Sequence, residues 1–414
     1  MNISSVCVIG LGYIGLPTAA VLASRKVRVY GVDINSRAVD SINQGKIHIV
    51  EPDLDILVHS VVNEGYLKAS TTPQCADAFV IAVPTPFKNH FQPDLSYVEA
   101  AARSIAPFLA KGNLVVLEST SPVGTTEMIS SLLAEMRPDL TFPHTEGVSA
   151  DISIAYCPER VLPGHILREL VHNARVIGGV SPSCTERATE LYKLFVDGEC
   201  IATNSRTAEM CKLTENSFRD VNIAFANELS MICDKLDVNV WELIKLANRH
   251  PRVNILQPGP GVGGHCIAVD PWFIVAKTPE ESRLIKTARE VNDFKPQFVI
   301  KKINELQKKF ESEKGKAPSI AFLGLAFKAN IDDLRESPAL HIVEYFDGKL
   351  PDAVAVEPNI QEPPKSLKHI KLVGMEQGLN SDIIVLLVDH TEFKQLSKET
   401  LRTKFVLDTR GAWV

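Results

Sequence analysis

The sequence predicts an α/β protein in which two doubly wound domains are joined by a long central helix. Buried β-type runs alternate with helical stretches in the first half, a helical period continues from Asn204 to Lys235, and a second strand-and-glycine pattern opens at Ser319. Alternation of this kind favours parallel sheets covered by helices. A chain of 414 residues is also too long for one ordinary core. We expect domains at residues 1–203, 204–300 and 301–414.

The first element carries a dinucleotide-binding pattern. A β-type run, Ser5 to Ile9, enters G-x-G-x-x-G and then a helical stretch from Pro17 to Ser24. In this Rossmann arrangement the glycines permit a tight turn and the close approach of a pyrophosphate, which the helix N-terminus stabilises. The residues expected at the turn are Gly10, Gly12, Tyr13, Ile14 and Gly15.

The second strand bears on the choice between NAD and NADP. Val27 to Val32 is followed by Asp33, where a carboxylate bonds the adenosine ribose hydroxyls and repels the extra phosphate of NADP. Arg37 lies nearby, and an arginine can accommodate that phosphate. Because an acid at the end of the second strand normally determines the choice between NAD and NADP, we expect NAD as the cofactor.

Three later strand ends carry polar residues. The run from Ala78 to Val83 leads into Thr85, and the run from Leu114 to Leu117 leads into the loop that holds Thr120 and Thr126. Ligands bind at the carboxyl ends of strands in open α/β sheets, so these threonines are candidate cofactor contacts. For Thr126 a helix N-cap is the alternative.

The third strand end, after Ile154, presents Glu159 beside Arg160. An exposed ion pair between these two neighbours explains that arrangement equally well in isolation.

The central region has two helical faces. An apolar face is formed by Phe218, Val221, Phe225, Leu229 and Ile232, and a polar face by Lys212, Asn216, Arg219 and Asp220. Alone, the polar stripe would usually be a solvated surface. A second helix, Val240 to Ala247, begins after Asn239 as in a capping box and ends at a basic cluster that contains His250 and Arg252.

The candidate catalytic loop is PGPGVGGHCIAVDPW, residues 258–272. Its glycines let the backbone approach a ligand closely, so Cys266 would lie on an exposed turn. Asp270 follows four residues later, near enough to orient a water or an ammonium group. The alternative is that Cys266 is a small buried hydrophobe, as many reduced cysteines are.

The C-terminal part repeats the pattern of the first domain. After a lysine-rich stretch, residues 301–316, the run from Ser319 to Lys328 is similar to the opening strand and turn. Lys328 and Arg335 follow this strand, so we expect them at a cleft between the two α/β domains.

Composition excludes several classes of protein. A net charge of -6 with both signs interspersed argues against a nucleic-acid partner and a polybasic membrane anchor. Eight cysteines without a C-x-x-C pair suggest neither a zinc site nor a disulfide framework, and they fit a reducing compartment. The apolar run from Val6 to Ala23 lacks a positive start and is broken by glycines, so we expect no signal or membrane segment.

Together these motifs resemble the nucleotide-sugar 6-dehydrogenase family, whose best-known member is UDP-glucose dehydrogenase. The resemblance covers essentially the whole chain and rests on G-L-G-Y-I-G, S-T-S-P-V-G-T-T, K-L-T-E-N, G-V-G-G-H-C and F-K-A-N-I-D-D-L-R-E-S-P. P-E-R-V-L-P-G and N-R-H-P-R-V-N-I-L-Q-P-G-P-G are most similar to the branch that acts on UDP-N-acetyl-D-mannosamine in bacterial surface-polysaccharide synthesis. Pro163 stands where glucose-type members carry a second glutamate, which disfavours UDP-glucose.

The resemblance implies a four-electron oxidation of a primary alcohol to a carboxylate with two NAD and no metal, in a cytoplasmic homodimer joined through the central helix. The Cys266 thiolate would form a thiohemiacetal and then a thioester, with Lys212 or a water held by Asp270 as the first base. Lys212 and Asn216 would stabilise the oxyanion, and Glu159 would activate the hydrolytic water. Thr120 completes this catalytic set.

Further contacts are implied by the same resemblance. Arg335 would meet the nicotinamide cofactor, and Arg252 would reach into the neighbouring subunit. Residues implied at the UDP-sugar are Arg160, Val161, Lys212, Asn216, Arg219, His250, Arg252, Gly263, Phe327 and Lys328. Two alternatives stay open: UDP-N-acetylglucosamine or UDP-glucose as substrate, and a catalytically silent NAD-binding sensor on the same fold.

Overall fold

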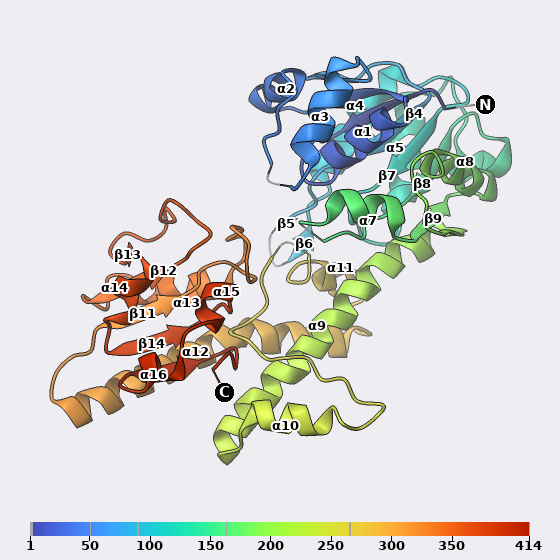
Figure 1. Cartoon of the computed structure of the whole chain (residues 1–414). Helices are drawn as coiled ribbons and strands as arrows, with labels where there is room; N and C mark the ends of the chain where they lie inside the picture. The colour runs from blue at the N-terminus through green and yellow to red at the C-terminus, as the bar shows by residue number, and fades with distance from the viewer. Residues whose placement is uncertain (1–2, 50, 89–90, 163, 265, 414) are drawn as a thin grey trace. The chain divides into compact units, whose positions relative to one another are not determined.

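The computed structural model describes residues 3–49, 51–88, 91–162, 164–264 and 266–413 (Figure 1). The chain divides into two compact units, Met1–Glu215 and Asn216–Val414. The division falls inside the long helix α9 (Ser205–Leu236), which the helical period predicted. The three-domain boundaries expected from the sequence stay a prediction.

The first unit is built on an eight-stranded sheet of order β10-β9-β8-β7-β4-β1-β2-β3. Neighbouring strands run parallel, except that β9 is antiparallel to β8. The strands are β1 (Ser5–Ile9), β2 (Arg28–Val32), β3 (Leu67–Ser70), β4 (Ala78–Ile81), β7 (Leu114–Leu117), β8 (Ser153–Tyr156), β9 (Arg175–Gly179) and β10 (Cys200–Asn204). A short hairpin, β5 (Phe87–Lys88) and β6 (Gln92–Pro93), follows β4.

Helices cover both faces of this sheet, as doubly wound folds require. Val6 and Val8 of β1 belong to one buried core and Cys7 and Ile9 to the other, because successive strand side chains point to opposite faces. The helices are α1 (Gly15–Ser24), α2 (Ser36–Asn43), α3 (Leu54–Asn63), α4 (Ser96–Ile105), α5 (Thr125–Met136), α6 (Pro143–Glu146), α7 (Ile166–His172) and α8 (Pro182–Tyr192).

The second unit holds a five-stranded parallel sheet of order β13-β12-β11-β14-β15. Its strands are β11 (Ile320–Leu323), β12 (Ala353–Val356), β13 (Lys371–Leu372), β14 (Ile383–Leu386) and β15 (Phe405–Asp408). Besides the rest of α9, its helices are α10 (Val240–Ala247), α11 (Asp270–Lys277), α12 (Arg283–Lys314), α13 (Pro338–Phe346), α14 (Met375–Leu379), α15 (Thr391–Lys394) and α16 (Lys398–Leu401). The predicted cap of α10 is present, since the Asn239 side chain accepts from the N–H groups of Trp241 and Glu242.

Most of the lysine-rich stretch lies in the long helix α12. Residues 301–314 are the second half of this long helix, and Ile303 and Phe310 are buried in the core of the C-terminal sheet. Pro296 lies inside the helix. A proline normally predicts a helix end, so the length of α12 was not predictable from the sequence pattern. The lysines are its solvated face.

The predicted repeat of the first domain is confirmed in detail. In each domain a glycine at positive φ (92° at Gly10, 95° at Gly324) ends the first strand. The N–H of this glycine donates to the carbonyl of the last residue of the second strand. The N–H of the residue after the glycine donates to the carboxylate that follows the second strand. These bonds are Gly10 N to Val32 O (2.8 Å), Leu11 N to Asp33 Oδ2 (2.9 Å), Gly324 N to Val356 O (2.9 Å) and Leu325 N to Glu357 Oε2 (2.8 Å).

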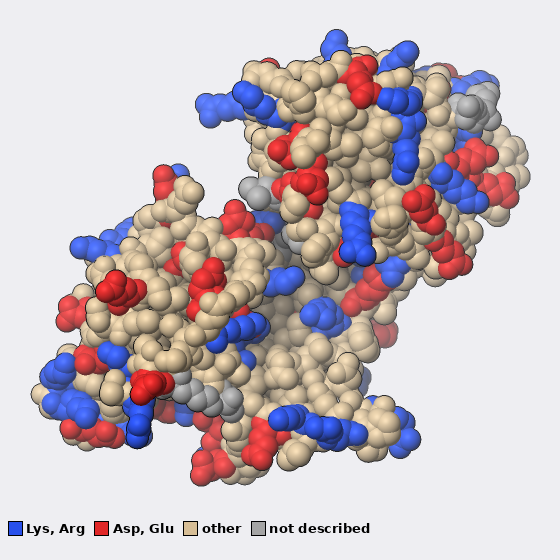
Figure 2. Space-filling model, in the orientation of Figure 1, with Lys and Arg blue, Asp and Glu red and all other residues tan. Residues whose placement is uncertain are grey.

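The surface carries both signs of charge. Figure 2 shows lysine and arginine intermixed with aspartate and glutamate over the face drawn. Among the described residues, no helix has the length and apolar character that crossing a bilayer requires.

Candidate active site

The glycine turn after β1 is shaped for a cofactor. A Cβ on Gly10 would lie 2.6 Å from the Ala82 carbonyl oxygen, and one on Gly15 would lie 1.7 Å from that of Gly10, so these two glycines allow close packing. A Cβ on Gly12 would meet nothing within 4 Å. That open side, next to the N-terminus of α1, is where the pyrophosphate of a dinucleotide can approach the backbone.

Asp33 keeps acceptor capacity for a ribose. Its Oδ2 accepts from Leu11 N at 2.9 Å and its Oδ1 from Asn35 N at 2.8 Å. Because each carboxylate oxygen can accept more than one hydrogen bond, the half-buried group can still receive a ribose diol. Arg37 is exposed in the first turn of α2.

Asp33→Ala is expected to narrow the preference for NAD over NADP, because it removes both the ribose acceptor and the charge that repels a 2′-phosphate. The measurement is kcat/KM for each cofactor, with Asp40→Ala, at an exposed acid on the following helix α2, as the matched control. Equal use of both cofactors by the unaltered enzyme would contradict this role of Asp33.

The loops that hold Thr85 and Thr120 are joined by a hydrogen bond. Thr85 Oγ1 donates to the carbonyl oxygen of Thr120 at 2.6 Å, which joins the loops after β4 and β7. The N-cap interpretation of Thr126 is wrong, because Thr126 is the second residue of α5 and fully buried. Its Oγ1 donates to Glu209 Oε1 at 2.6 Å, and Gly124 N also donates to that carboxylate.

Glu209 therefore caps α5 from helix α9, a role that no local sequence signal indicates. Burial raises the pKa of this carboxyl. A cofactor contact by Thr126 stays a prediction.

Glu159 has a different partner from the one its sequence neighbour suggests. Its Oε2 accepts from Arg175 Nη1 at 2.9 Å, and both side chains are buried. Arg160 pairs instead with Glu215 at 2.7 Å, although its backbone N–H donates to Glu159 Oε1. The exposed Glu159–Arg160 ion pair is thus wrong, since the long side chain of Arg175 reaches Glu159 from β9.

The thiol-bearing turn is tied to helices α9 and α11. Asp270 is buried at the first position of α11, and its N–H donates to the Cys266 carbonyl at 2.8 Å. The Asn216 side chain donates to Asp270 Oδ2. Cys266 is half-buried and lies outside the described cores, which disfavours the small-hydrophobe alternative. Lys212 lies one turn before Asn216 on α9, so the two share a face.

The glycines of this loop pack on the segment after β11. A Cβ on Gly263 would lie 2.5 Å from the Glu336 carbonyl oxygen and 2.8 Å from Phe327 Cβ. Gly264, at φ 82°, lies against the Phe327 ring, and its N–H donates to the Arg335 carbonyl at 3.1 Å. The motifs G-V-G-G-H-C and F-K-A-N-I-D-D-L-R-E-S-P are therefore in contact within one unit.

The other substrate and cofactor candidates lie at surfaces. Arg335 is exposed and pairs with Asp333 in its own loop at 2.6 Å. Val161 is half-buried against the first core, and Pro163 lies outside the described residues. The exposed candidates are Lys328 after β11, Arg219 on α9, and His250 and Arg252 after α10.

Two residues of the loop's surroundings were missed. The Asn227 Oδ1 accepts from Gly259 N at 2.9 Å in a buried position. A Cβ on Gly259 would lie 2.3 Å from the Arg410 guanidinium, which Asp389 holds at 2.9 Å. Only contacts distant in the sequence bring them here, so no local pattern could have found them.

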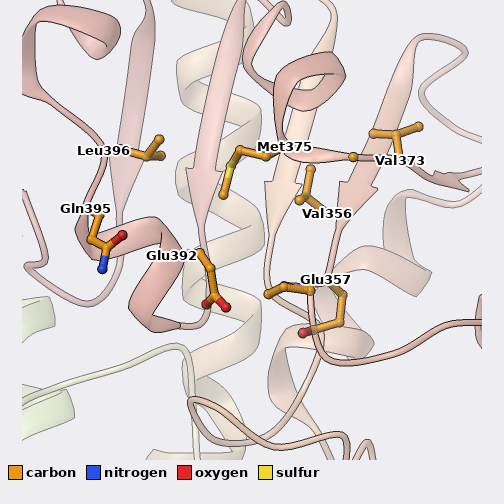
Figure 3. A pocket seen from close by; sticks show the side chains of 9 residues that line it. Val356, Glu357, Val373, Met375, Glu392, Gln395 and Leu396 are labelled. Atoms are coloured by element: carbon orange, nitrogen blue, oxygen red, sulfur yellow. The ribbon is translucent and has the colours of Figure 1, made fainter.

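A pocket of about 410 Å³ opens at the ends of β12 and β13 (Figure 3). The repeat places Glu357 in this domain where Asp33 lies in the first. However, Glu357 is fully buried and bonded to His390 Nε2 at 2.9 Å, and Ala326 N also donates to it. A ribose therefore finds no available acceptor at Glu357. The lining residues are Val356, Glu357, Pro358, Val373, Gly374, Met375, Glu392, Gln395 and Leu396.

The first unit carries a glycine turn with a strand-end acid, as NAD-binding domains do. The second unit carries a cysteine turn joined to Asp270 and Asn216, as expected of an NAD-dependent dehydrogenase. Sequence profiles of the UDP-glucose/GDP-mannose dehydrogenase family match three segments: the NAD binding domain at residues 4–196, the central domain at 206–294 and the UDP binding domain at 321–414. The chain belongs to this family, and NAD is its cofactor.

Named relatives cover the full length. The chain is 64% identical to the UDP-N-acetyl-D-mannosamine dehydrogenase of Campylobacter jejuni, over 96% of this chain and 98% of that protein. It is 63% identical to the NDP-N-acetyl-D-galactosaminuronic acid dehydrogenase of Ralstonia nicotianae, over 100% and 97%. The solved UDP-D-ManNAc dehydrogenase of Pyrococcus horikoshii is similar, with a TM-score of 0.88, 40% identity and coverage of 99% and 96%. The family and fold predicted from the sequence are thereby confirmed.

Proposed function

We propose that this enzyme oxidises C6 of UDP-N-acetyl-D-mannosamine to UDP-N-acetyl-D-mannosaminuronate, with two NAD and one water, for bacterial surface-polysaccharide synthesis. The observation that carries the reaction class is the Cys266 turn, whose backbone is bonded to Asp270, which in turn is bonded to Asn216. The full-length similarity to relatives named for this substrate supports the sugar.

In the first half-reaction the C6 hydroxyl loses its proton to Lys212, or to a water held by Asp270, and loses a hydride from carbon. NAD supplies the hydride acceptor in both halves. The product is an aldehyde, which is a poor hydride donor in its planar form.

In the second half-reaction the Cys266 thiolate adds to the aldehyde carbon, and the tetrahedral thiohemiacetal loses the second hydride to give a thioester. Lys212 and Asn216 donate to the oxyanion of the adduct, and Glu159 takes a proton from the water that cleaves the thioester. Cleavage returns the thiol and releases the carboxylate, so four electrons leave the sugar in total.

A second sugar has a specific observation in its favour. The Ralstonia relative, named for N-acetyl-D-galactosaminuronic acid, is 63% identical over the full chain. UDP-N-acetyl-D-galactosamine is therefore the competing substrate. Both candidates carry the 2-acetamido group that UDP-glucose lacks.

The substrate test is NADH formation from a panel of UDP-sugars: N-acetylmannosamine, N-acetylgalactosamine, N-acetylglucosamine and glucose. We expect the highest kcat/KM with UDP-N-acetyl-D-mannosamine and near-inertness with UDP-glucose. A higher kcat/KM for any other sugar would transfer the assignment to that sugar, and no turnover with any of them would favour the sensor.

A homodimer through α9 is part of the proposal. Phe218 is 71% exposed and Phe225 is 52% exposed on this helix, which is a large apolar area to leave in water. We expect light scattering to give twice the chain mass, and Phe218→Glu to give monomers. The matched control is Glu228→Gln, at an exposed polar position of the same helix. A monomeric unaltered protein would contradict the dimer. Eight thiols without disulfides support a cytoplasmic location.

A further inference from the structure

The first unit buries a second carboxylate beside the Glu159–Arg175 pair. Glu118 follows β7 directly and is 2% exposed. Its Oε1 accepts from Tyr192 Oη at 2.6 Å, and its Oε2 accepts from Thr18 Oγ1 at 3.4 Å. No step of the proposed reaction uses Glu118.

Arg175, which pairs with Glu159, also favours the ionised form of Glu118 through its charge. Arg175 is 1% exposed, donates to Glu159, and places its guanidinium 5.6 Å from the centroid of the Tyr192 ring, whose hydroxyl holds Glu118. Among the described residues the Arg175 Nε has no hydrogen-bond partner. Its Nη2 donates to the Leu170 carbonyl at 3.2 Å, so Glu159 accepts from only one of the three nitrogens of the guanidinium.

The charges of this cluster do not balance when both acids are ionised, because the buried cluster then holds two carboxylates and one guanidinium. Cys157 and Tyr192, the other titratable groups that face Glu118, stay neutral because burial raises the pKa of each. Burial raises the pKa of Glu118 to about 7, so this acid changes charge near neutral pH.

We propose that Glu118 is a positioning residue whose charge decides how tightly Arg175 holds Glu159, and so whether Glu159 is available to activate water. The proposal rests on the proposed function, in which Glu159 serves thioester hydrolysis. When Glu118 is neutral, Glu159 is the one carboxylate of this cluster that attracts the Arg175 guanidinium. When Glu118 is ionised, it attracts the guanidinium and loosens that pair.

The test is the rate of acyl-enzyme hydrolysis as a function of pH, followed by rapid quenching of a single turnover with labelled UDP-N-acetyl-D-mannosamine. An acid with a pKa of about 7 is ionised to roughly a tenth at pH 6 and roughly nine tenths at pH 8. Release by the unaltered enzyme is expected to rise about tenfold over this range, in proportion to the ionised fraction. Glu118→Gln keeps an acceptor for Tyr192 and is permanently neutral, so its release should stay at or below the pH 6 value of the unaltered enzyme throughout this range.

Controls separate charge from packing. Glu190→Gln makes the same chemical change at an exposed site on α8 and should keep the tenfold rise. Tyr192→Phe removes a donor to ionised Glu118, so its rise should move to higher pH. A full rise in Glu118→Gln, or an unmoved rise in Tyr192→Phe, would overturn the proposal.

A second readout does not depend on activity. Infrared difference spectra between pH 6 and pH 8 should show the loss of a protonated-carboxyl band that Glu118→Gln lacks. Absence of that band from the unaltered protein would overturn the inference even if the enzyme is active. Absence of NADH with every UDP-sugar would instead contradict the proposed function, while the band still reports the ionisation of Glu118.

Discussion

Cys266→Ala will lower release of the uronate by roughly 10³-fold or more, the scale expected when a covalent nucleophile is removed. The aldehyde then has no thiolate to make it a hydride donor, so any residual oxidation stops after one NADH per sugar. The measurement is quenched-flow analysis of the sugar products with NADH counted in parallel.

Two further variants test the same prediction. Cys266→Ser should fold and bind NAD and UDP-sugar, but serine is a poorer nucleophile and its ester hydrolyses slowly, so labelled sugar should accumulate on the protein. Cys211→Ser, a half-buried cysteine on α9, is the matched control and should leave both half-reactions intact. Near-normal uronate release by Cys266→Ala would contradict a covalent mechanism.

Glu118→Gln is expected to gain stability relative to the unaltered protein as pH rises. The folded-state pKa of Glu118 is raised from 4.5 to about 7 by burial, so between these values the native state holds a proton that the unfolded state has released. Stability therefore falls as pH rises through this window, by about 2–3 kcal/mol between pH 5 and pH 8, and the penalty persists above it. The neutral amide of the variant escapes that penalty.

Urea unfolding at pH 5 and pH 8 measures the difference directly. The free energy of unfolding of the variant, relative to the unaltered protein, should increase by about 2–3 kcal/mol between the two pH values. Glu190→Gln should show no such change. Parallel pH dependences for Glu118→Gln and the unaltered protein would mean that Glu118 is already ionised at pH 5.

Features that follow from a local sequence pattern or a known motif were predictable. The strand before Gly10 and the Asn239 cap depend on residues within a few positions of one another. The length of α9 follows from a helical repeat, and Asp33 from the fixed layout of a strand, glycine turn, helix and second strand. The repeat at Gly324 was visible because the C-terminal domain uses the same strand-and-turn chemistry.

Partnerships between distant elements were not predictable. Arg175 reaches Glu159 from β9, Glu209 caps α5 from α9, and His390 pairs with Glu357 across the C-terminal sheet. Each of these pairs depends on which strand or helix the fold brings next to the residue, and a local sequence pattern does not contain that information. Helix α12 was missed for another reason, since Pro296 and the solvated lysines concealed its apolar stripe.

The measurement that tests the central claim most directly is the yield of NADH per UDP-N-acetyl-D-mannosamine consumed to completion, with the sugar product identified by mass. A four-electron oxidation through Cys266 predicts two NADH and the uronate, with no free aldehyde. One NADH per sugar with the aldehyde as final product would contradict the proposed reaction.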